Sequence, residues 1–166
     1  MKNYLVTGGA GFIGSNFIHL LLKKYSDTIT IHNIDSLTYS GNLENLKEIE
    51  SLPNYFFHKV NITDYEALDK VFQDNKIDIV INFAAESHVD RSILGCKEFI
   101  HTNIDGTRVL LDLARKYEIE KFIQISTDEV YGSLGDEGAF TENSYIKPNS
   151  PYSASKASAD LLVRSY

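Results

Sequence analysis

Two adjacent acidic residues, Asp128 and Glu129, follow the apolar segment Lys121–Ser126, which has the composition of a buried strand. Neighbouring carboxylates repel each other and are costly to bury, so such a pair on its own would be expected in solvent. Two carboxyl groups in unlike environments can, however, differ in protonation and act as an acid and a base. The pair is therefore a candidate catalytic site if other segments bring a cofactor and a substrate to it.

A tyrosine and a lysine four residues apart on a helix share one face and can form a catalytic pair. The lysine charge lowers the pKa of the tyrosine, so that the phenolate can act as a base near neutral pH. This spacing occurs at Tyr55–Lys59, Tyr117–Lys121 and Tyr152–Lys156. We expect the first pair in a strand and the second across a helix end. Tyr152–Lys156 falls within a predicted helix, because Ser150 is a good N-cap and Pro151 suits the first helical position.

The segment VTGGAGFIG lies between a predicted strand and a predicted helix near the N-terminus. It fits two phosphate-binding patterns, Gly9-x-Gly11-x-x-Gly14 and Gly8-x-x-Gly11-x-x-Gly14, in which glycine lets the backbone approach a pyrophosphate. Asp35 ends the next predicted strand, 21 residues after Gly14 (35 − 14), close to the spacing of about 20 expected for a ribose-binding acid. An acid there repels a 2′-phosphate, so the pattern favours NAD over NADP.

The apolar periodicity alternates between strand and helix patterns, without a repeat or linker that would divide the chain. Predicted strands are Tyr4–Thr7, Thr28–Ile34, Tyr55–Ile62, Ile77–Ala84 and Lys121–Ser126, and predicted helices are Ile13–Lys24, Leu43–Ile49, Asp64–Gln73, about Ile93 to Tyr117 and a last one from Pro151. This order predicts an α/β fold, a Rossmann-like doubly wound parallel sheet with helices on both faces. Ligands of such sheets bind beyond the carboxyl ends of the strands, where the glycine segment, Asp35 and the acidic pair all fall.

The segment AAESHVDRS follows the fourth predicted strand and reaches the same edge of the sheet. Its Glu86 and His88 could contact a ligand or simply hold the loop in place. Thr102, Asn103 and Gly106 lie in the long helical segment, where a glycine lowers helix stability. Close packing against a cofactor and close packing against the sheet would both explain Gly106, and the sequence leaves these alternatives open.

The net charge of −7 argues against nucleic acid or an anionic membrane as the main partner of the 166-residue chain. No apolar run approaches the roughly eighteen residues of a membrane span, and the N-terminus leads directly into the strand–glycine pattern without room for a signal peptide. Cys96 is the only cysteine, and it shows no metal-ligand spacing with the histidines. We therefore expect a cytoplasmic protein without a metal site.

Four motifs together, TGGAGFIG, AAESHVDRS, STDEVYG and PYSASKASAD, resemble those of the extended short-chain dehydrogenase/reductase family, and within it the dTDP-glucose 4,6-dehydratases. The segment IDSLTYSGNLENL is similar as well, and the resemblance extends over the whole chain. The Thr127-Asp128-Glu129 triplet is the most specific part, because related sugar-nucleotide 4-epimerases usually carry small or hydroxyl residues instead of the acids. The resemblance implies a hydro-lyase of deoxysugar biosynthesis that uses NAD and acts on dTDP-glucose or a related sugar nucleotide.

The resemblance also implies roles for the catalytic residues Thr127, Asp128, Glu129, Tyr152 and Lys156. Tyr152, assisted by Lys156, takes the proton of the sugar 4-hydroxyl, which Thr127 holds, while a hydride passes from C4 to NAD. Glu129 then removes the C5 proton that the 4-ketone has made acidic, and Asp128 protonates the departing C6 hydroxyl. The hydride returns to C6 and regenerates NAD. Such an internal redox cycle needs an acid and a base side by side, which accounts for the acidic pair.

Carried over by position, the resemblance implies a cofactor site that combines the glycine segment, the strand ends and the Tyr–Lys pair. Its predicted members are Gly8, Gly11, Phe12, Ile13, Gly14, Asp35, Ser36, Leu37, Thr38, Asn61, Ile62, Ala84, Ala85, Ser87, Thr102, Tyr152 and Lys156. Ser87 and Thr127 would also contact the substrate. Asn61 departs from the family pattern, which usually has Asp there to contact the adenine amino group. Because Asn61 keeps a side-chain oxygen acceptor, we expect NAD binding to persist with altered strength.

The last predicted helix carries no stop signal before Tyr166, so we expect a chain cut within a helix, with residues 1–166 forming an incomplete NAD-binding Rossmann domain. In the family a C-terminal domain holds most of the sugar nucleotide, and the helix that mediates homodimer formation continues past this point. We therefore expect the chain alone to bind NAD weakly and to turn over poorly. The alternatives are another sugar-nucleotide dehydratase or 4-epimerase of the same family, or a non-catalytic NAD-binding module.

Overall fold

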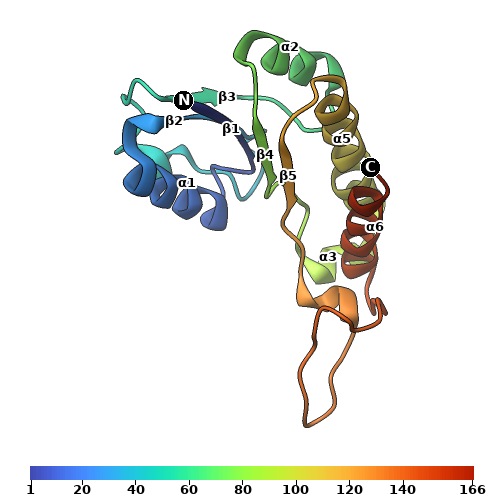
Figure 1. Ribbon diagram of the computed structural model, residues 1–166. Helices are drawn as coiled ribbons and strands as arrows, with labels where there is room; N and C mark the ends of the chain where they lie inside the picture. The colour runs from blue at the N-terminus through green and yellow to red at the C-terminus, as the bar shows by residue number, and fades with distance from the viewer.

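The computed structural model describes residues 1–166 and contains a parallel sheet of five strands in the order β3-β2-β1-β4-β5 (Figure 1). The strands are β1 (Lys2–Thr7), β2 (Ile29–Ile34), β3 (Tyr55–His58), β4 (Ile79–Asn82) and β5 (Lys121–Gln124). The central strand β1 pairs with β2 on one side and with β4 on the other, so that Tyr4 lies opposite Ile31 and Ile79. The chain winds outward from β1 in both directions, which confirms the doubly wound parallel sheet.

Helices cover both faces of this sheet (Figure 1). α1 (Phe12–Tyr25), followed by the 3₁₀ turn η1 (Ser26–Thr28), packs on one face, whereas α2 (Tyr65–Asn75) and α5 (Thr107–Lys116) cover the other. The first face buries Val6, Ala10, Ile18, Leu21, Leu22, Ile29, Ile31, Leu46, Ile49 and Tyr55, and the second buries Leu5, Ile34, Ile62, Leu68, Val71, Phe72, Ile77, Val80, Val109, Leu110 and Leu113. No helix combines the length and the apolar character needed to cross a membrane.

Three predicted strands run past the ends of the observed ones, because the apolar pattern continues where pairing has stopped. β3 ends at His58, β4 at Asn82 and β5 at Gln124. The residues that continue the pattern, such as Ile62 and Ala84, line a cleft beyond the sheet edge instead. An apolar side chain is equally suited to a sheet core and to a cleft wall, so the sequence pattern could not separate them.

The single long helix predicted from Ile93 to Tyr117 is wrong. Helical structure begins earlier, in α3 (Val89–Leu94), and breaks at Gly95, whose backbone is extended (φ −171°, ψ 113°). It resumes in α4 (Lys97–Phe99) and widens into the π-helical segment η3 (Ile100–Gly106) before α5 begins. π turns inside helices are frequent at functional sites.

The predicted helix Leu43–Ile49 is also wrong, because only the 3₁₀ turn η2 (Leu43–Leu46) forms there. The Asn42 side chain caps this turn by accepting a backbone hydrogen bond of 3.0 Å. Leu46 and Ile49 are the two buried side chains of the segment. Two apolar anchors hold a turn against α1, but they do not form the apolar stripe that stabilises an amphipathic helix.

A long excursion without helix or strand leaves the domain between the 3₁₀ turn η4 (Asp128–Tyr131) and the last helix, α6 (Pro151–Ser165) (Figure 1). Its neck is closed by the Lys147 amide, which donates to the Val130 carbonyl at 2.9 Å. At Gly135 and Gly138 an added methyl group would meet no atom within 4 Å. The chain therefore leaves and re-enters the domain at one place.

Candidate functional site

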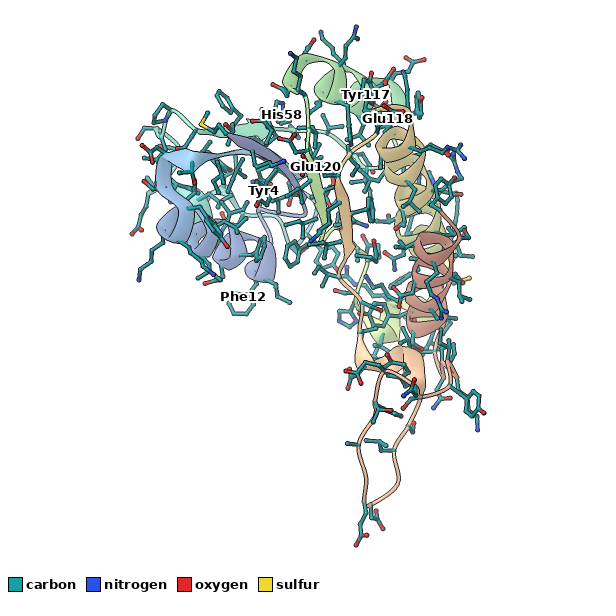
Figure 2. The ribbon with its side chains drawn as sticks, in the orientation of Figure 1. Tyr4, Phe12, His58, Tyr117, Glu118 and Glu120 are labelled. Carbon is teal, nitrogen blue, oxygen red and sulfur yellow. The ribbon has the colours of Figure 1, made fainter.

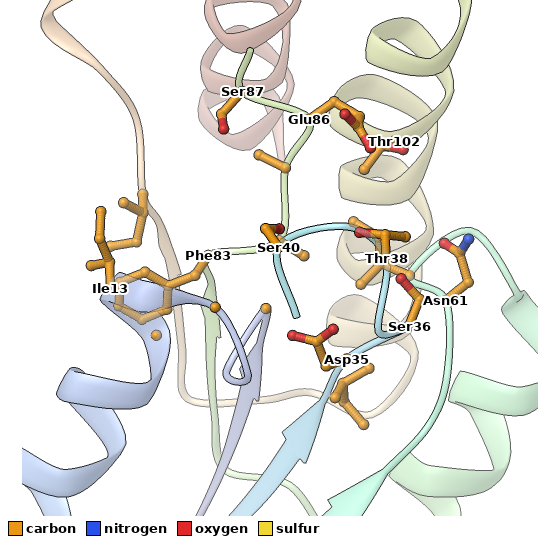
Figure 3. Close-up of a pocket in the computed structure, with 18 of the residues that line it drawn as sticks. Ile13, Asp35, Ser36, Thr38, Ser40, Asn61, Phe83, Glu86, Ser87 and Thr102 are labelled. Atoms are coloured by element: carbon orange, nitrogen blue, oxygen red, sulfur yellow. The ribbon is translucent and has the colours of Figure 1, made fainter. Parts of the chain in front are cut away.

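A cleft of about 360 Å³ lies at the carboxyl edge of the sheet, where the winding direction reverses between β1 and β4 (Figure 3). Segments that follow all five strands contribute to its wall, together with η3 and α6. The lining residues are Gly8, Gly11, Phe12, Ile13, Gly14, Ile34, Asp35, Ser36, Thr38, Ser40, Val60, Asn61, Ile62, Phe83, Ala84, Ala85, Glu86, Ser87, Thr102, Ile125, Ser126, Tyr152 and Lys156. Open α/β sheets bind their ligands at this kind of crevice.

The residues predicted for a cofactor site all line this cleft, with the exception of Leu37. Leu37 adopts a left-handed backbone (φ 54°) and packs against the apolar cluster beside α1. Of the two uncertain residues in the β4–α3 loop, Glu86 lines the cleft, whereas His88 is exposed outside it. The sequence reasoning missed Ile34, Ser40, Val60, Phe83, Ile125 and Ser126, although each of them adjoins or lies near a residue that had been singled out.

The turn between β1 and α1 forms a cradle made of backbone. Gly8 has φ +66°, and a Cβ on it would lie 2.7 Å from the Ala84 nitrogen. A Cβ on Gly14 would lie 2.3 Å from the Gly8 carbonyl oxygen, so neither position admits a side chain. The helix N-cap, Gly11, provides no capping side chain, and the first turn of α1 carries no acid. The amides of that turn are therefore open to an anion in the cleft.

The Asp35 carboxylate is held at the floor of the cleft by backbone amides (Figure 3). Its Oδ2 accepts a hydrogen bond from the Ala10 amide at 3.0 Å, and its Oδ1 accepts one from the Leu37 amide at 2.8 Å. The residue is 9% exposed. Each carboxylate oxygen retains acceptor capacity beyond one amide, so Asp35 can still accept from a ligand hydroxyl.

The Asn61 side chain does not present the free acceptor that the sequence suggested. Its Oδ1 accepts from both the amide and the hydroxyl of Thr63, at 3.0 Å each, in a local turn. Its Nδ2 has no partner in the protein. Asn61 therefore offers the cleft an amide donor, whereas the carboxylate usual in the family would offer an acceptor.

The predicted start of the last helix is confirmed by its capping interactions. The Ser150 hydroxyl accepts from the Ser153 amide at 3.0 Å, and the Ser153 hydroxyl accepts from the Ser150 amide at 3.0 Å. This capping box fixes the first turn of α6 with Pro151 at its start. Tyr152 and Lys156 then share the buried face of α6, at 9% and 4% exposure, and both line the cleft.

Tyr152 lies within the influence of the triplet at the end of β5. Burial raises the pKa of Tyr152, an interaction with the Thr127 side chain lowers it, and the charges of Glu129 and Asp128 raise it further. Thr127 also caps η4, since its hydroxyl accepts from the Glu129 amide at 3.3 Å. The triplet does not line the cleft itself; Asp128 is exposed and Glu129 is half-buried just beyond Ser126. The structure thus brings Tyr152 and both acids to the same end of the cleft.

Burial is the main cause of the shift in the Tyr152 pKa, and the Lys156 ammonium makes its hydrogen bond elsewhere. Lys156 Nζ donates to the carbonyl of Ile125 at the end of β5. Burial lowers the pKa of Lys156 itself. The motif correctly places the two side chains on one helix face, but the strand carbonyl, not the phenol, orients the ammonium.

Asn103 and Gly106 of the π-helical segment both make contacts within the protein. Its Oδ1 accepts from the Glu86 amide at 2.8 Å, while its Nδ2 donates to the Glu86 carbonyl at 2.9 Å and to Ser155 Oγ at 2.8 Å. The side chain thus clamps the β4–α3 loop to α6. Gly106 packs against the protein, since a Cβ there would lie 2.5 Å from Cδ1 of Ile62, which lines the cleft. Both residues shape the cleft wall from behind.

The strand order and the position of the cleft are those of a doubly wound, dinucleotide-binding α/β protein. Residues 5–166 match the family model described as GDP-mannose 4,6 dehydratase, and the chain belongs to this family. It is 52% identical over 162 residues to the low-salt glycan biosynthesis protein Agl12 of Haloferax volcanii, an alignment that covers 98% of this chain and 51% of that protein.

Two solved structures show how closely the fold is shared. The dTDP-glucose 4,6-dehydratase of Bacillus anthracis, in complex with NAD, superposes with a TM-score of 0.90 at 52% identity, covering 100% of this chain and 50% of that one. The dTDP-glucose 4,6-dehydratase DesIV of Streptomyces venezuelae, with NAD and TYD bound, gives a TM-score of 0.93 at 46% identity, covering 99% and 51%. The chain spans about half the length of the relatives it matches.

Proposed function

We propose that this chain is the NAD-binding and catalytic part of a dTDP-glucose 4,6-dehydratase, a hydro-lyase that forms dTDP-4-keto-6-deoxyglucose and water. The observation that carries the proposal is the meeting of Tyr152 and Lys156 with Asp128 and Glu129 at one end of a dinucleotide-type cleft. Two solved dTDP-glucose 4,6-dehydratases, similar over essentially the whole chain, contain NAD. A simple dehydrogenase has no step that needs an additional acid and base.

The residues of the cleft fit NAD. Gly8 and Gly14 leave no room for side chains, so a pyrophosphate can approach the backbone and the open amides of α1. Asp35 would accept from the hydroxyls of the adenosine ribose, and its charge would repel a 2′-phosphate. Tyr152 and Lys156 stand at the opposite end, where the nicotinamide would lie. When bound, NAD supplies a hydride acceptor that becomes a hydride donor later in the same cycle. The remaining cleft residues predicted from the sequence, including Ser87 and Thr102, would complete the site.

Three side chains carry the proton transfers, Tyr152, Glu129 and Asp128, and two others, Thr127 and Lys156, support them. Tyr152 would take the proton of the substrate 4-hydroxyl, with the Thr127 hydroxyl holding that group. Because burial and the two acids raise the pKa of Tyr152, this step requires the Lys156 charge to act on the phenol. The half-buried Glu129 would remove the C5 proton and return a proton to C5 after water has left. Asp128, which is exposed and can exchange protons with solvent, would protonate the C6 hydroxyl as it leaves as water.

The decisive experiment is mass spectrometry of dTDP-glucose incubated with NAD and the complete product of the gene that encodes this chain. We expect a product lighter by one water without net accumulation of NADH. In D₂O the product should carry deuterium at C5, because Glu129 exchanges its proton with solvent before C5 is reprotonated. We expect the isolated 166-residue chain to bind NAD weakly and to turn over slowly.

Matched variants connect this result with the acidic pair. Glu129→Gln and Asp128→Asn should each lower kcat at least about 100-fold while NAD stays bound. Glu142→Gln, which changes an exposed acid of the excursion, should leave kcat unchanged. Unchanged dTDP-glucose with tightly bound NAD would overturn the dehydratase assignment; other sugar nucleotides would be tested next, and a non-catalytic NAD module after that.

We also propose that the complete protein is a cytoplasmic homodimer. The exposed, free Cys96 suits a reducing compartment. Three large apolar side chains are uncovered on the neighbouring helices α3 and α6, with Ile93 66% exposed, Leu94 90% and Leu161 53%. A second copy would bury them. Leu94→Lys with Leu161→Lys should convert the dimer to a monomer in sedimentation velocity experiments; an unchanged sedimentation coefficient would contradict this interface.

A further inference from the structure

Asp160 is a half-buried acid that the proposed mechanism does not use. It lies one turn after Lys156 on α6, and its Oδ2 accepts a hydrogen bond from Ser126 Oγ. Ser126 directly follows Ile125, whose carbonyl accepts from Lys156 Nζ. Lys156 and Asp160 therefore hold two consecutive residues at the end of β5, and both of these residues line the cleft.

We propose that Asp160 is a positioning residue for Lys156: its carboxylate fixes the end of β5 to α6, next to the carbonyl that holds the ammonium, and places a negative charge near that buried ammonium. This inference rests on the proposed function of the site. The strand end that Asp160 fixes leads directly into Thr127 and the acidic pair, so the same contact sets how the triplet faces Tyr152.

The electrostatics of the pair agree with this role. Burial lowers the pKa of Lys156, and Asp160 is the charged group that raises it. Burial raises the pKa of Asp160, while the hydrogen bond from Ser126 and the Lys156 charge lower it. Each partner therefore favours the ionised form of the other against desolvation.

An ordinary helix-surface ion pair does not account for the arrangement. Lys156 is 4% exposed, so its ammonium does not lie freely in solvent. A lysine four residues before an acid is also the weaker orientation of such pairs on a helix. The Asp160 carboxylate instead bonds across to the strand through Ser126. The contact joins two elements, which is what positioning a catalytic lysine requires.

Two substitutions separate the charge from the hydrogen bond. Asp160→Asn keeps an acceptor for Ser126 but removes the charge, whereas Ser126→Ala removes the hydrogen bond but keeps the charge. The first readout is a ¹³C NMR titration of the Lys156 side chain in the complete gene product, which requires no turnover. We expect Lys156 to titrate at a lower pH in D160N than in the unchanged chain, and at a nearly unchanged pH in S126A and in D160E.

The second readout is steady-state kinetics on the complete gene product. D160N should lower kcat about tenfold with KM within about twofold, because the charge of a base-activating lysine is depleted while binding is retained. D160E should restore most of kcat. Glu44→Gln is the matched control, because it removes an exposed partner of Lys47 at 3.2 Å, away from α6, and should change neither readout.

Equal titration of Lys156 in D160N and in the unchanged chain would overturn the inference. Asp160→Ser provides a second uncharged variant if D160N does not fold, and the same criterion applies to it. A shifted Lys156 titration in a protein that does not convert dTDP-glucose would support the positioning role and refute the proposed function. The two ideas therefore fail separately.

Discussion

The two ends of the cleft are built from different materials. The cradle end, comprising the Gly8–Gly14 turn and Asp35, is defined by backbone: glycines that admit no Cβ and a carboxylate held by amides. The reactive end, comprising Ser126–Glu129 with Tyr152 and Lys156, is defined by side chains that cross between β5 and α6. The Asp35 carboxylate of the cradle end is buried and bonded to backbone amides, whereas Asp128 and Glu129 of the reactive end are exposed and half-buried, respectively.

This difference follows from what each end has to recognise. A dinucleotide presents the same phosphates and riboses in every cycle. A rigid backbone site suits it, because such a site needs little rearrangement, and so little free energy, when the dinucleotide binds. A reacting sugar changes its protonation and charge during the cycle, and the groups that serve it must exchange protons. A backbone cradle therefore tolerates almost no substitution, while the reactive end tolerates changes that preserve charge and hydrogen bonding.

The largest expected effect breaks the cradle. Gly14→Ala places a Cβ about where it would overlap the Gly8 carbonyl, so we expect a loss of about 3 kcal/mol in unfolding free energy and loss of NAD binding. Chemical denaturation and calorimetric titration with NAD measure both. Gly95→Ala is the control, because a Cβ there meets nothing within 4 Å. If G14A retained NAD affinity, the cradle would have to be less rigid than its geometry indicates.

A second prediction tests the strands that carry the cradle. His32 Nδ1 lies 3.2 Å from His58 Nε2 between β2 and β3 (His58 is labelled in Figure 2), and burial, then the His58 charge, lowers the pKa of His32 from 6.5 to about 4. In the unfolded chain His32 therefore binds a proton below about pH 6.5, whereas in the folded chain it binds one only below about pH 4. Stability should fall by up to about 3 kcal/mol between pH 6.5 and 4.

Denaturation midpoints measured across this pH range test the prediction. His32→Gln should flatten the pH dependence, because it removes the buried titrating ring. His88→Gln, at an exposed position just before α3, is the control variant. An identical pH profile in H32Q and in the unchanged chain would assign the acid sensitivity to another group.

A third prediction concerns the β4–α3 loop, which both ends of the cleft share. Asn103→Ala leaves the amide and carbonyl of Glu86 without their buried partner, so we expect a loss of about 2 kcal/mol in unfolding free energy. NAD affinity should fall as well, because Glu86 lines the cleft. Asn143→Ala, in the exposed excursion, is the control. Undiminished stability in N103A would show that the loop is held by other contacts.

The smallest expected effect concerns a contact between α3 and the loop after β2, whose residues Ser36, Thr38 and Ser40 line the cleft. The guanidinium of Arg91, in α3, stacks on the ring of Tyr39, in the loop after β2, with 4.6 Å between Cζ and the ring centroid. Removing a contact of roughly 0.5–1 kcal/mol should speed NAD release about two- to fivefold in Tyr39→Ala. Tyr39→Phe keeps the stacking and should release NAD at the original rate. Stopped-flow displacement of NAD resolves these rates, and equal rates in Y39A and Y39F would refute the contact's role.

The sequence predicted the cradle better than it predicted the reactive end. The glycine spacing and the interval to Asp35 are local patterns that have one structural solution, so the strand–turn–helix unit could be read directly. The start of α6 was equally readable, because Ser150 and Pro151 carry capping signals that act over a few residues.

Long-range contacts were not readable. Nothing local indicates that Asn103 bonds across to Glu86, or that Lys156 is oriented by the carbonyl of Ile125. The helical periodicity around Asn103 did not reveal the π-helical segment, because a π turn is a change in backbone hydrogen bonding that residue types do not signal. Asn61 shows the same limit over a shorter distance. Its residue type suggested an oxygen free to accept from a ligand, but the Thr63 hydroxyl already donates to that oxygen.

The excursion between η4 and α6 has a practical consequence for anyone who engineers this protein. Its neck is fixed by the hydrogen bond between Lys147 and Val130, and an added methyl group at Gly135 or Gly138 would meet no atom within 4 Å. A dye, an affinity tag or an inserted domain placed between Gly135 and Gly138 would lie outside the domain, a few residues from Asp128 and Glu129 in the chain, and we expect it not to disturb them. The excursion is therefore a suitable insertion site for a reporter group near the candidate catalytic residues.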